Sequence, residues 1–326
     1  TEHYTLLDGI RAVAKAENPE LRLMVSEGCH LWRENVEALA EADDRRSEAV
    51  AMARRADVVI LCVGLNGTLE GEEGDANNSY AGADKADLLL PLPQRRLIRE
   101  VAAVGTPIVL VNATGSAMAL GEEAELCNAV LQVWYPGQMG GLAAAEVLFD
   151  KINPSGKLPV TFYRTTEELP PFTEYAMQGR TYRFMQNEPL YPFGYGLSYT
   201  RFAYTGLTAV PAPDGSCTVR ATVTNVGTRK GSDVAQVYLR LIGAAGRVPR
   251  CSLAAFRRVT LEPGQSTELH FTLPKTAFAE YDTQGREVYT AAEAEISLGG
   301  GQPDARTAAL TGMVVPTTTV KWGGWQ

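Results

Sequence analysis

The sequence predicts two domains: an α/β sandwich, with a mostly parallel sheet covered by helices on both faces, followed by an all-β sandwich. Short apolar runs at residues 58–64, 108–112 and 130–134 alternate with segments of helical period, as expected for strands buried on both faces of a parallel sheet. From about residue 205 the apolar period changes to two, with turn signals between short segments, which is typical of a β-sandwich. The 326 residues also exceed what one core usually holds, about 250 to 300 residues.

The first half contains the alternating elements. Apolar residues recur at helical spacing over 5–16, 45–56, 92–104 and 140–149, and strands are expected at 21–25, 58–64, 108–112 and 130–134. Such a sheet normally opens with a strand, yet here a helix begins near residue 5. We therefore expect the chain to be a C-terminal piece of a longer polypeptide, or one product of a split gene.

A glycine-rich stretch at residues 136–141 opens the helix at 140–149. A helix start of this kind can bind anions, but the stretch lacks both G-x-G-x-x-G and G-x-x-x-x-G-K-[ST]. We expect its glycines to serve tight packing of the helix on the sheet.

The second half begins with a change of composition. Residues 164–200 are rich in proline, glycine and aromatic residues without a helical period, and are expected to form an extended connector whose aromatic side chains pack between domains. Period-2 segments such as 218–223 and 234–239 follow. The predicted divisions are thus 1–163 for the α/β sandwich, 164–200 for the connector, and 201–326 for the all-β domain with a C-terminal tail.

Composition argues against several classes of partner. The net charge is -8 and the pI about 5.1, so no nucleic-acid partner is expected, because such binding depends on clustered lysine and arginine. No apolar run approaches the roughly 18 residues of a membrane span, so no membrane partner is expected. The five cysteines show no C-x-x-C spacing and the three histidines are scattered, which predicts neither a metal site nor a disulfide framework. Cys62 and Cys127 lie in apolar runs and are expected to be buried thiols.

The most informative segment is an acidic loop. Residues 69–75 read LEGEEGD, placing four carboxylates within seven residues directly after the strand expected at 58–64. Ligands bind beyond the carboxyl ends of the strands in an open parallel sheet. A solvated acidic surface or a cluster of oxygen ligands for calcium are the alternatives, although the EF-hand spacing is absent.

Five ordered motifs give the sequence a resemblance to a known family. The resemblance to the C-terminal half of glycoside hydrolase family 3 extends from about residue 5 to about residue 300, and is carried by the motifs at 69–75, 131–138, 153–162, 179–183 and 191–199. It implies an α/β sandwich followed by a fibronectin type III-like domain, both usually preceded by a TIM-like barrel. It also implies a retaining, exo-acting β-glycosidase that needs no cofactor and no metal.

The resemblance assigns roles to particular residues. The general acid/base falls on Glu70, with Glu72 and Glu73 as fallback candidates, while the nucleophilic Asp belongs to the barrel and has no counterpart in this chain. Retaining hydrolysis needs both carboxyl groups, so we expect the chain to be inactive alone and to work with a barrel domain or fragment. Crowding of Glu70 by its acidic neighbours would favour a protonated carboxyl there.

The form of the motifs is most like that of bacterial β-xylosidases, which also accept arabinofuranosides. The expected substrate is therefore an oligosaccharide with terminal β-linked xylose. A β-glucosidase of the same family and a non-catalytic carbohydrate-binding module are the alternatives. The sequence leaves open a homo-oligomer and whether the protein is cytoplasmic, periplasmic or secreted.

Overall fold

The computed structural model describes residues 3–32, 43–70 and 85–321. The chain divides into two compact units: Thr1–Ile152 with Tyr163–Thr166, and Asn153–Phe162 with Glu167–Gln326. Within the described ranges, no helix is both long and apolar enough to cross a bilayer.

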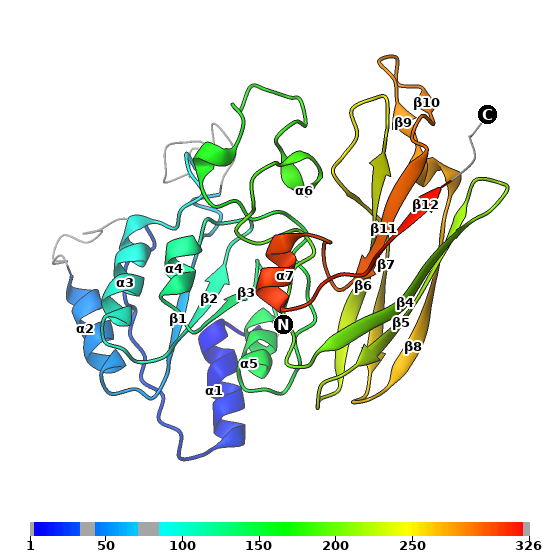
Figure 1. Cartoon of the computed structure of the whole chain (residues 1–326). Helices are drawn as coiled ribbons and strands as arrows, with labels where there is room; N and C mark the ends of the chain where they lie inside the picture. Colours follow the sequence, from blue (N-terminus) through cyan, green and yellow to red (C-terminus); the bar gives the residue numbers. More distant parts are fainter. Residues whose placement is uncertain (1–2, 33–42, 71–84, 322–326) are drawn as a thin grey trace. The chain divides into compact units, whose positions relative to one another are not determined.

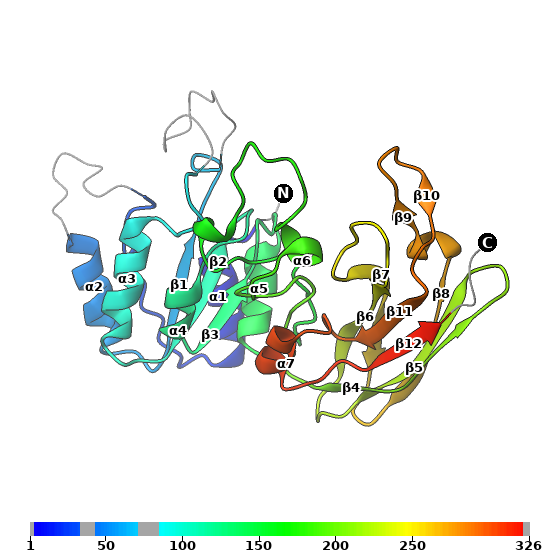
Figure 2. The ribbon, with the colours of Figure 1, turned by 45° about the horizontal axis from the view of Figure 1, so that its top comes forward.

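The first unit is an α/β layer structure (Figure 1). Its elements are α1 (Leu6–Glu17), α2 (Asp44–Ala53), β1 (Val59–Gly64), α3 (Leu92–Ala102), β2 (Ile108–Ala113), α4 (Gly121–Glu125), β3 (Ala129–Gln132) and α5 (Gly140–Leu148), with a 3₁₀ turn at Thr166–Glu168. Strands β1, β2 and β3 lie side by side in that order and are parallel, with Val59 opposite Ile108 and Val109 opposite Ala129 (Figure 2). Their carboxyl ends therefore share one edge of the sheet.

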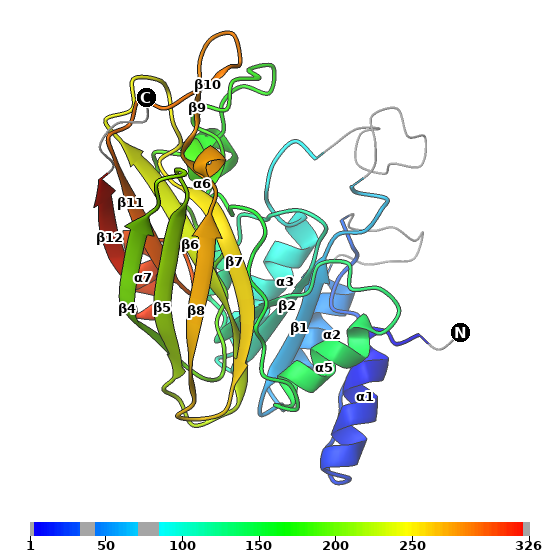
Figure 3. The same cartoon turned by 90° about the vertical axis from the view of Figure 1, so that its right-hand side faces the viewer.

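Helices lie on both sides of this sheet (Figure 3). Ile10 and Val13 of α1 and Ala145 of α5 form a small core with Ile60 of β1. Helix α3 lies on the opposite side and buries Ile98 completely. The capping box of α1, in which Thr5 and Asp8 bond each other's backbone, fixes where that helix begins.

Three expectations for this unit are wrong, and one short helix was not expected. Residues 21–25 form no strand; their apolar side chains are about 40 to 45% exposed, and no described strand pairs with them. The short helix α4 was not expected, because five residues are too few to show a period. Cys62 is exposed and Cys127 only half-buried. Finally, Gly141 of α5 does not pack on the sheet as expected, since a Cβ there would lie 2.1 Å from the carbonyl oxygen of Thr5, the N-cap residue of α1.

The second unit is an antiparallel β-sandwich. Its elements are α6 (Thr181–Phe184), β4 (Phe202–Pro211), β5 (Cys217–Asn225), β6 (Gly231–Ile242), β7 (Ser252–Leu261), β8 (Ser266–Leu273), a 3₁₀ turn (Lys275–Phe278), β9 (Glu280–Tyr281), β10 (Glu287–Val288), β11 (Glu293–Gly299), α7 (Ala305–Thr311) and β12 (Thr317–Lys321). The sheet β4-β5-β8 lies over the sheet β12-β11-β6-β7, and β9 and β10 form a separate hairpin (Figure 3). Buried alternate residues from both sheets, among them Val219, Val237 and Ile296, form the core.

The segment before β4 is tied to this sandwich by hydrogen bonds. The side-chain amide of Gln236 in β6 donates to the carbonyl of Gly194 at 3.0 Å, and the backbone N–H of Leu253 in β7 donates to the Tyr182 hydroxyl at 3.1 Å. Aromatic rings stack here, Tyr182 on Phe193 at 4.4 Å. Tyr175 departs from the expected packing, because 88% of it is exposed among the described residues.

Candidate active site at the carboxyl ends of the parallel strands

A tight turn leads from β1 to Glu70. The side-chain oxygen of Asn66 accepts hydrogen bonds from the backbone N–H and the hydroxyl of Thr68, at 3.0 and 2.7 Å, which is an Asx-type turn. The backbone carbonyl of Asn66 accepts from Leu69 and Glu70. Leu69 is fully buried, so burial on one side and the turn on the other fix the position from which Glu70 extends.

Three donors converge on the Glu70 carboxylate. The backbone N–H of Gly115 donates to its Oε2 at 3.0 Å. The Tyr135 hydroxyl donates to the same oxygen, and the Ser116 hydroxyl donates to Oε1. Glu70 follows β1, Gly115 and Ser116 follow β2, and Tyr135 follows β3. The cluster thus joins the ends of all three parallel strands, where such sheets bind ligands.

A buried polar network lies next to these donors. The amide nitrogen of Asn112, a fully buried residue at the end of β2, donates to Gln132 at 2.6 Å and to the Thr114 hydroxyl at 3.1 Å. The Thr114 hydroxyl in turn donates to the carbonyl of Ser116 at 2.9 Å. These bonds fix the backbone that carries Ser116. A second buried amide, Gln94 of α3, bonds both backbone groups of Gly64, each at 2.8 Å, and fixes the end of β1.

Tyr135 is placed by a backbone bend. The preceding Trp134 has φ 57°, in the left-handed region that few residues other than glycine adopt. The pKa of the Tyr135 phenol is raised, first by partial burial, then by its hydrogen bond to Glu70 and by the charge of that carboxylate. The phenol therefore stays protonated at neutral pH and donates to Glu70. About half of Tyr135 remains exposed.

This arrangement makes Glu70 an acceptor. Both of its oxygens are engaged by donors, whereas a general acid must present a proton to the leaving group. Glu70 would have to leave three partners to do so. Glu72 and Glu73, the fallback candidates for this role, lie outside the described residues. Within the described ranges, no group of three or more His, Cys, Asp or Glu side chains is arranged to bind a metal ion.

Glu70 lies at the strand ends, where the sequence predicted the start of the acidic loop, but sequence reasoning missed its hydrogen-bond partners. A signal for them existed. Gly115 and Ser116 directly follow the strand expected at 108–112, and Tyr135 follows the one expected at 130–134. The rule that pointed to the acidic loop applies equally to the ends of neighbouring strands.

Comparison with known proteins identifies relatives of both units. A model of the glycosyl hydrolase family 3 C-terminal domain matches residues 1–199, and a model of the fibronectin type III-like domain matches residues 233–302. These matches confirm the predicted fold class of both domains. The exact divisions at 163 and 200 stay a prediction.

Two curated proteins and one solved structure illustrate the likeness. A xylan 1,4-beta-xylosidase of Xylanibacter ruminicola is 39% identical over 267 residues, which are 81% of this chain and 31% of that protein. A periplasmic beta-glucosidase of Salmonella typhimurium is 36% identical over 253 residues, 73% of this chain and 32% of that protein. The structure of a β-glucosidase from Erythrobacter marinus matches with a TM-score of 0.82 and 30% identity, covering 98% of this chain and 43% of that one. The chain thus spans about a third of the length of these curated relatives.

Proposed function

Because the chain belongs to glycoside hydrolase family 3, we propose that it is the C-terminal part of a retaining, exo-acting β-glycosidase. The observation that supports this proposal most directly is the cluster around Glu70. In this cluster Glu70 lies at the carboxyl ends of parallel strands, where such sheets bind ligands, in a chain whose relatives are named as β-xylosidases and β-glucosidases.

The substrate we propose is an oligosaccharide with a terminal β-linked xylose, with arabinofuranosides as further substrates. The relative named as a xylan 1,4-beta-xylosidase is 39% identical and the one named as a periplasmic beta-glucosidase 36% identical. The difference is small, so a β-glucosidase is the second candidate.

The chemistry divides between two polypeptide regions. Retaining hydrolysis uses two carboxyl groups about 5 to 5.5 Å apart, a nucleophile and a general acid/base. We propose that the nucleophile comes from a barrel domain or fragment outside this chain, and the acid/base from the acidic loop that begins at Glu70. No cofactor takes part in this reaction.

The hydrogen bonds of Glu70 favour different roles for the acidic residues of the loop. Three donors orient Glu70 and fix the start of the loop, which suits a positioning residue or an acceptor for a substrate hydroxyl. The proton donor would then be Glu72 or Glu73. Assignment of the acid/base to Glu70, the first choice from the sequence, stays a prediction that the same experiment tests.

The experiment compares Glu70→Gly, Glu72→Gly and Glu73→Gly in the active assembly that contains this chain. Loss of the acid/base slows substrates with poor leaving groups far more than aryl glycosides with good ones, and azide restores turnover by attacking the glycosyl-enzyme intermediate. We expect this signature for Glu72→Gly or Glu73→Gly, with a loss of about 10²-fold or more on poor leaving groups. Glu70→Gly should slow all substrates to a similar degree, without rescue.

Glu125→Gln, an exposed glutamate on α4, is the matched control and should retain full activity. Azide rescue of Glu70→Gly would return the acid/base to that residue. Full activity of all three loop variants on xylosides and glucosides would overturn the proposed function and favour a non-catalytic carbohydrate-binding module.

A further inference from the structure

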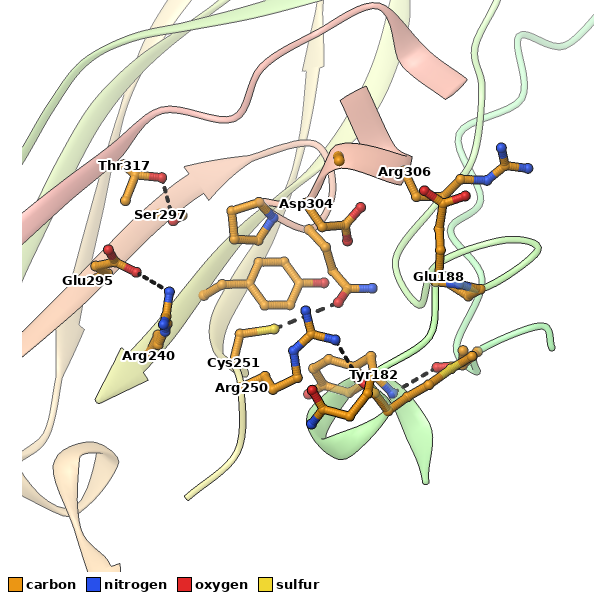
Figure 4. Close-up of a pocket in the computed structure, with 18 of the residues that line it drawn as sticks. Tyr182, Glu188, Arg240, Arg250, Cys251, Glu295, Ser297, Asp304, Arg306 and Thr317 are labelled. Carbon is orange, nitrogen blue, oxygen red and sulfur yellow. Dashed lines mark hydrogen bonds and ion pairs between the residues drawn. The ribbon is translucent and has the colours of Figure 1, made fainter. Parts of the chain in front are cut away.

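A cavity of about 500 Å³ lies within the β-sandwich unit (Figure 4). Its walls come mainly from the segment after α6, from β6 and β11, from the residues just before β7 and from the loop into α7. All of its lining residues belong to the second unit, whereas Glu70 and its donors belong to the first. Small-molecule sites commonly measure about 300 to 1,000 Å³, so the cavity is large enough for one or two sugar rings.

The cavity is lined by equal numbers of basic and acidic side chains. Three arginines and three acidic residues line it, which are Arg240, Arg250, Arg306, Glu188, Glu295 and Asp304 (Figure 4). One pair, Arg240 and Glu295, is joined at 3.2 Å. An anionic ligand would meet the carboxylates and a cationic ligand the guanidinium groups. A neutral ligand whose hydroxyl groups both donate and accept can use both kinds of side chain.

Two of the arginines are held by backbone carbonyl groups. Arg306 donates from Nε and Nη2 to the carbonyl of Leu190, at 3.1 and 3.0 Å. Arg250 donates from Nη1 to the carbonyl of Met185. A guanidinium group carries five N–H donors, so each arginine keeps donors for a ligand after these bonds are made. Their orientation is set before the ligand arrives, which lowers the entropic cost of binding.

Asp304 is likewise oriented by the fold. Its Oδ1 accepts from the backbone N–H of Thr307 at 2.7 Å and caps α7, and no bond to Oδ2 occurs among the described residues. The nearby Cys251 is a neutral thiol, because burial raises its pKa to about 11, and it contacts buried Gln302 at 3.7 Å. With Tyr182 also lining the cavity, the site combines fixed polar groups with an aromatic ring, which suits the polar and apolar faces of a sugar.

We propose that this cavity binds a neutral saccharide of one or two rings. The balanced charges call for a neutral polyhydroxylated ligand, and the choice of a sugar within that class rests on the proposed function. Asp304 Oδ2 would accept from a sugar hydroxyl, while Arg250 and Arg306 would donate to others.

The test is calorimetric titration of the 326-residue chain with xylobiose and cellobiose, and with glucuronic acid and glucosamine as charged probes. We expect saturable binding of at least one neutral disaccharide and weaker binding of both charged probes. Asp304→Asn retains the capping oxygen but replaces the charged acceptor Oδ2 by an amide nitrogen that can only donate, and should weaken binding about tenfold. Arg306→Lys, which cannot reproduce the fork, should also weaken binding.

Asp214→Asn is the matched control, because Asp214 also accepts a local backbone N–H, from Ser216 at 2.9 Å, but lies in an exposed turn outside the cavity. Its binding and its melting temperature should equal those of the wild type. No saturable binding of a neutral sugar, tighter binding of a charged probe, or unchanged affinity in both cavity variants would overturn the proposal. The readout involves no turnover, so it fails independently of the proposed glycosidase activity.

Discussion

Tyr135 is the donor of the Glu70 cluster whose protonation can be followed in solution. Its pKa is raised above the ordinary value of about 10 for tyrosine, so the folded state keeps a proton that the unfolded state loses. Its contribution to stability is therefore fully present below about pH 10 and is lost as the pH rises toward the higher folded value. Because half of the side chain is exposed, the size of this effect is reduced by solvent.

Tyr135→Phe tests this linkage. At about pH 8 we expect the variant to lose up to about 1 kcal/mol of unfolding free energy, the usual worth of a hydrogen bond. Between about pH 8 and about pH 11, the wild type should lose more unfolding free energy than the variant, because only the wild type has the Tyr135 phenol. Other tyrosines with raised pKa values, such as Tyr195 and Tyr238, contribute equally to both proteins. Urea unfolding at the two pH values measures it. Equal losses in both proteins would show that the bond to Glu70 does not form.

For the residues of the candidate site, the sequence indicated where Glu70 lies better than what it does. The acidic run LEGEEGD indicated a functional site, and its position after a strand predicted that this site lies at the carboxyl ends of the parallel strands. The acceptor role of Glu70 depends on donors 45 to 65 residues away in the chain, Gly115, Ser116 and Tyr135. No local pattern encodes such contacts, because they arise only when three strand ends meet.

Helices α1 and α5 meet through two glycines. A Cβ on Gly9 would lie 2.1 Å from the carbonyl oxygen of Gly141, and one on Gly141 would lie equally close to the carbonyl oxygen of Thr5. These contacts involve backbone atoms, so no side-chain movement can relieve them. The helices approach this closely only because both positions lack a side chain.

Gly9→Ala should therefore destabilise the first unit, although alanine favours a helix over glycine by about 1 kcal/mol. The added methyl group forces α1 away from α5 and opens the core of Ile10, Val13 and Ala145. Overpacking of this kind costs about 1 to 3 kcal/mol or more, and we expect a net loss of about 2 kcal/mol in urea unfolding.

The matched control is Gly67→Ala, because a Cβ there meets nothing within 4 Å. It should stay within about 0.5 kcal/mol of the wild type, as surface substitutions usually do. If Gly9→Ala proved as stable as this control, the close packing of α1 on α5 would be wrong.

Periodicity identified the long elements and failed on the short or unpaired ones. The helix expected over 5–16 is α1, Leu6–Glu17, and the strand expected over 108–112 is β2, Ile108–Ala113. Residues 21–25 are mostly apolar but form no strand, since a strand needs a neighbouring strand to bond as well as an apolar pattern. The packing of α5 on α1 was missed because a glycine in the sequence shows that another segment can approach the backbone closely, but not which segment does so.

At the scale of the whole molecule, the two units carry different kinds of site. The first holds a cluster of hydrogen bonds at the ends of parallel strands, and the second a cavity lined by balanced charges. In the proposed function the first unit needs a second carboxyl group for retaining hydrolysis, whereas all the residues that line the cavity belong to the second unit. The proposed barrel partner is therefore needed for catalysis but not for binding in the cavity.

This difference leads to a prediction about the nucleophile. A 2-fluoro xyloside with a good leaving group slows breakdown of the covalent glycosyl-enzyme intermediate, so the nucleophile becomes labelled and its polypeptide gains the mass of the sugar. We expect the isolated 326-residue chain to gain no mass and to show no turnover of an aryl β-xyloside. In an active assembly with the companion polypeptide, intact-mass measurement should place the label on the companion. A label on this chain, or turnover by this chain alone, would show that both carboxyl groups lie within it and that no barrel partner is required.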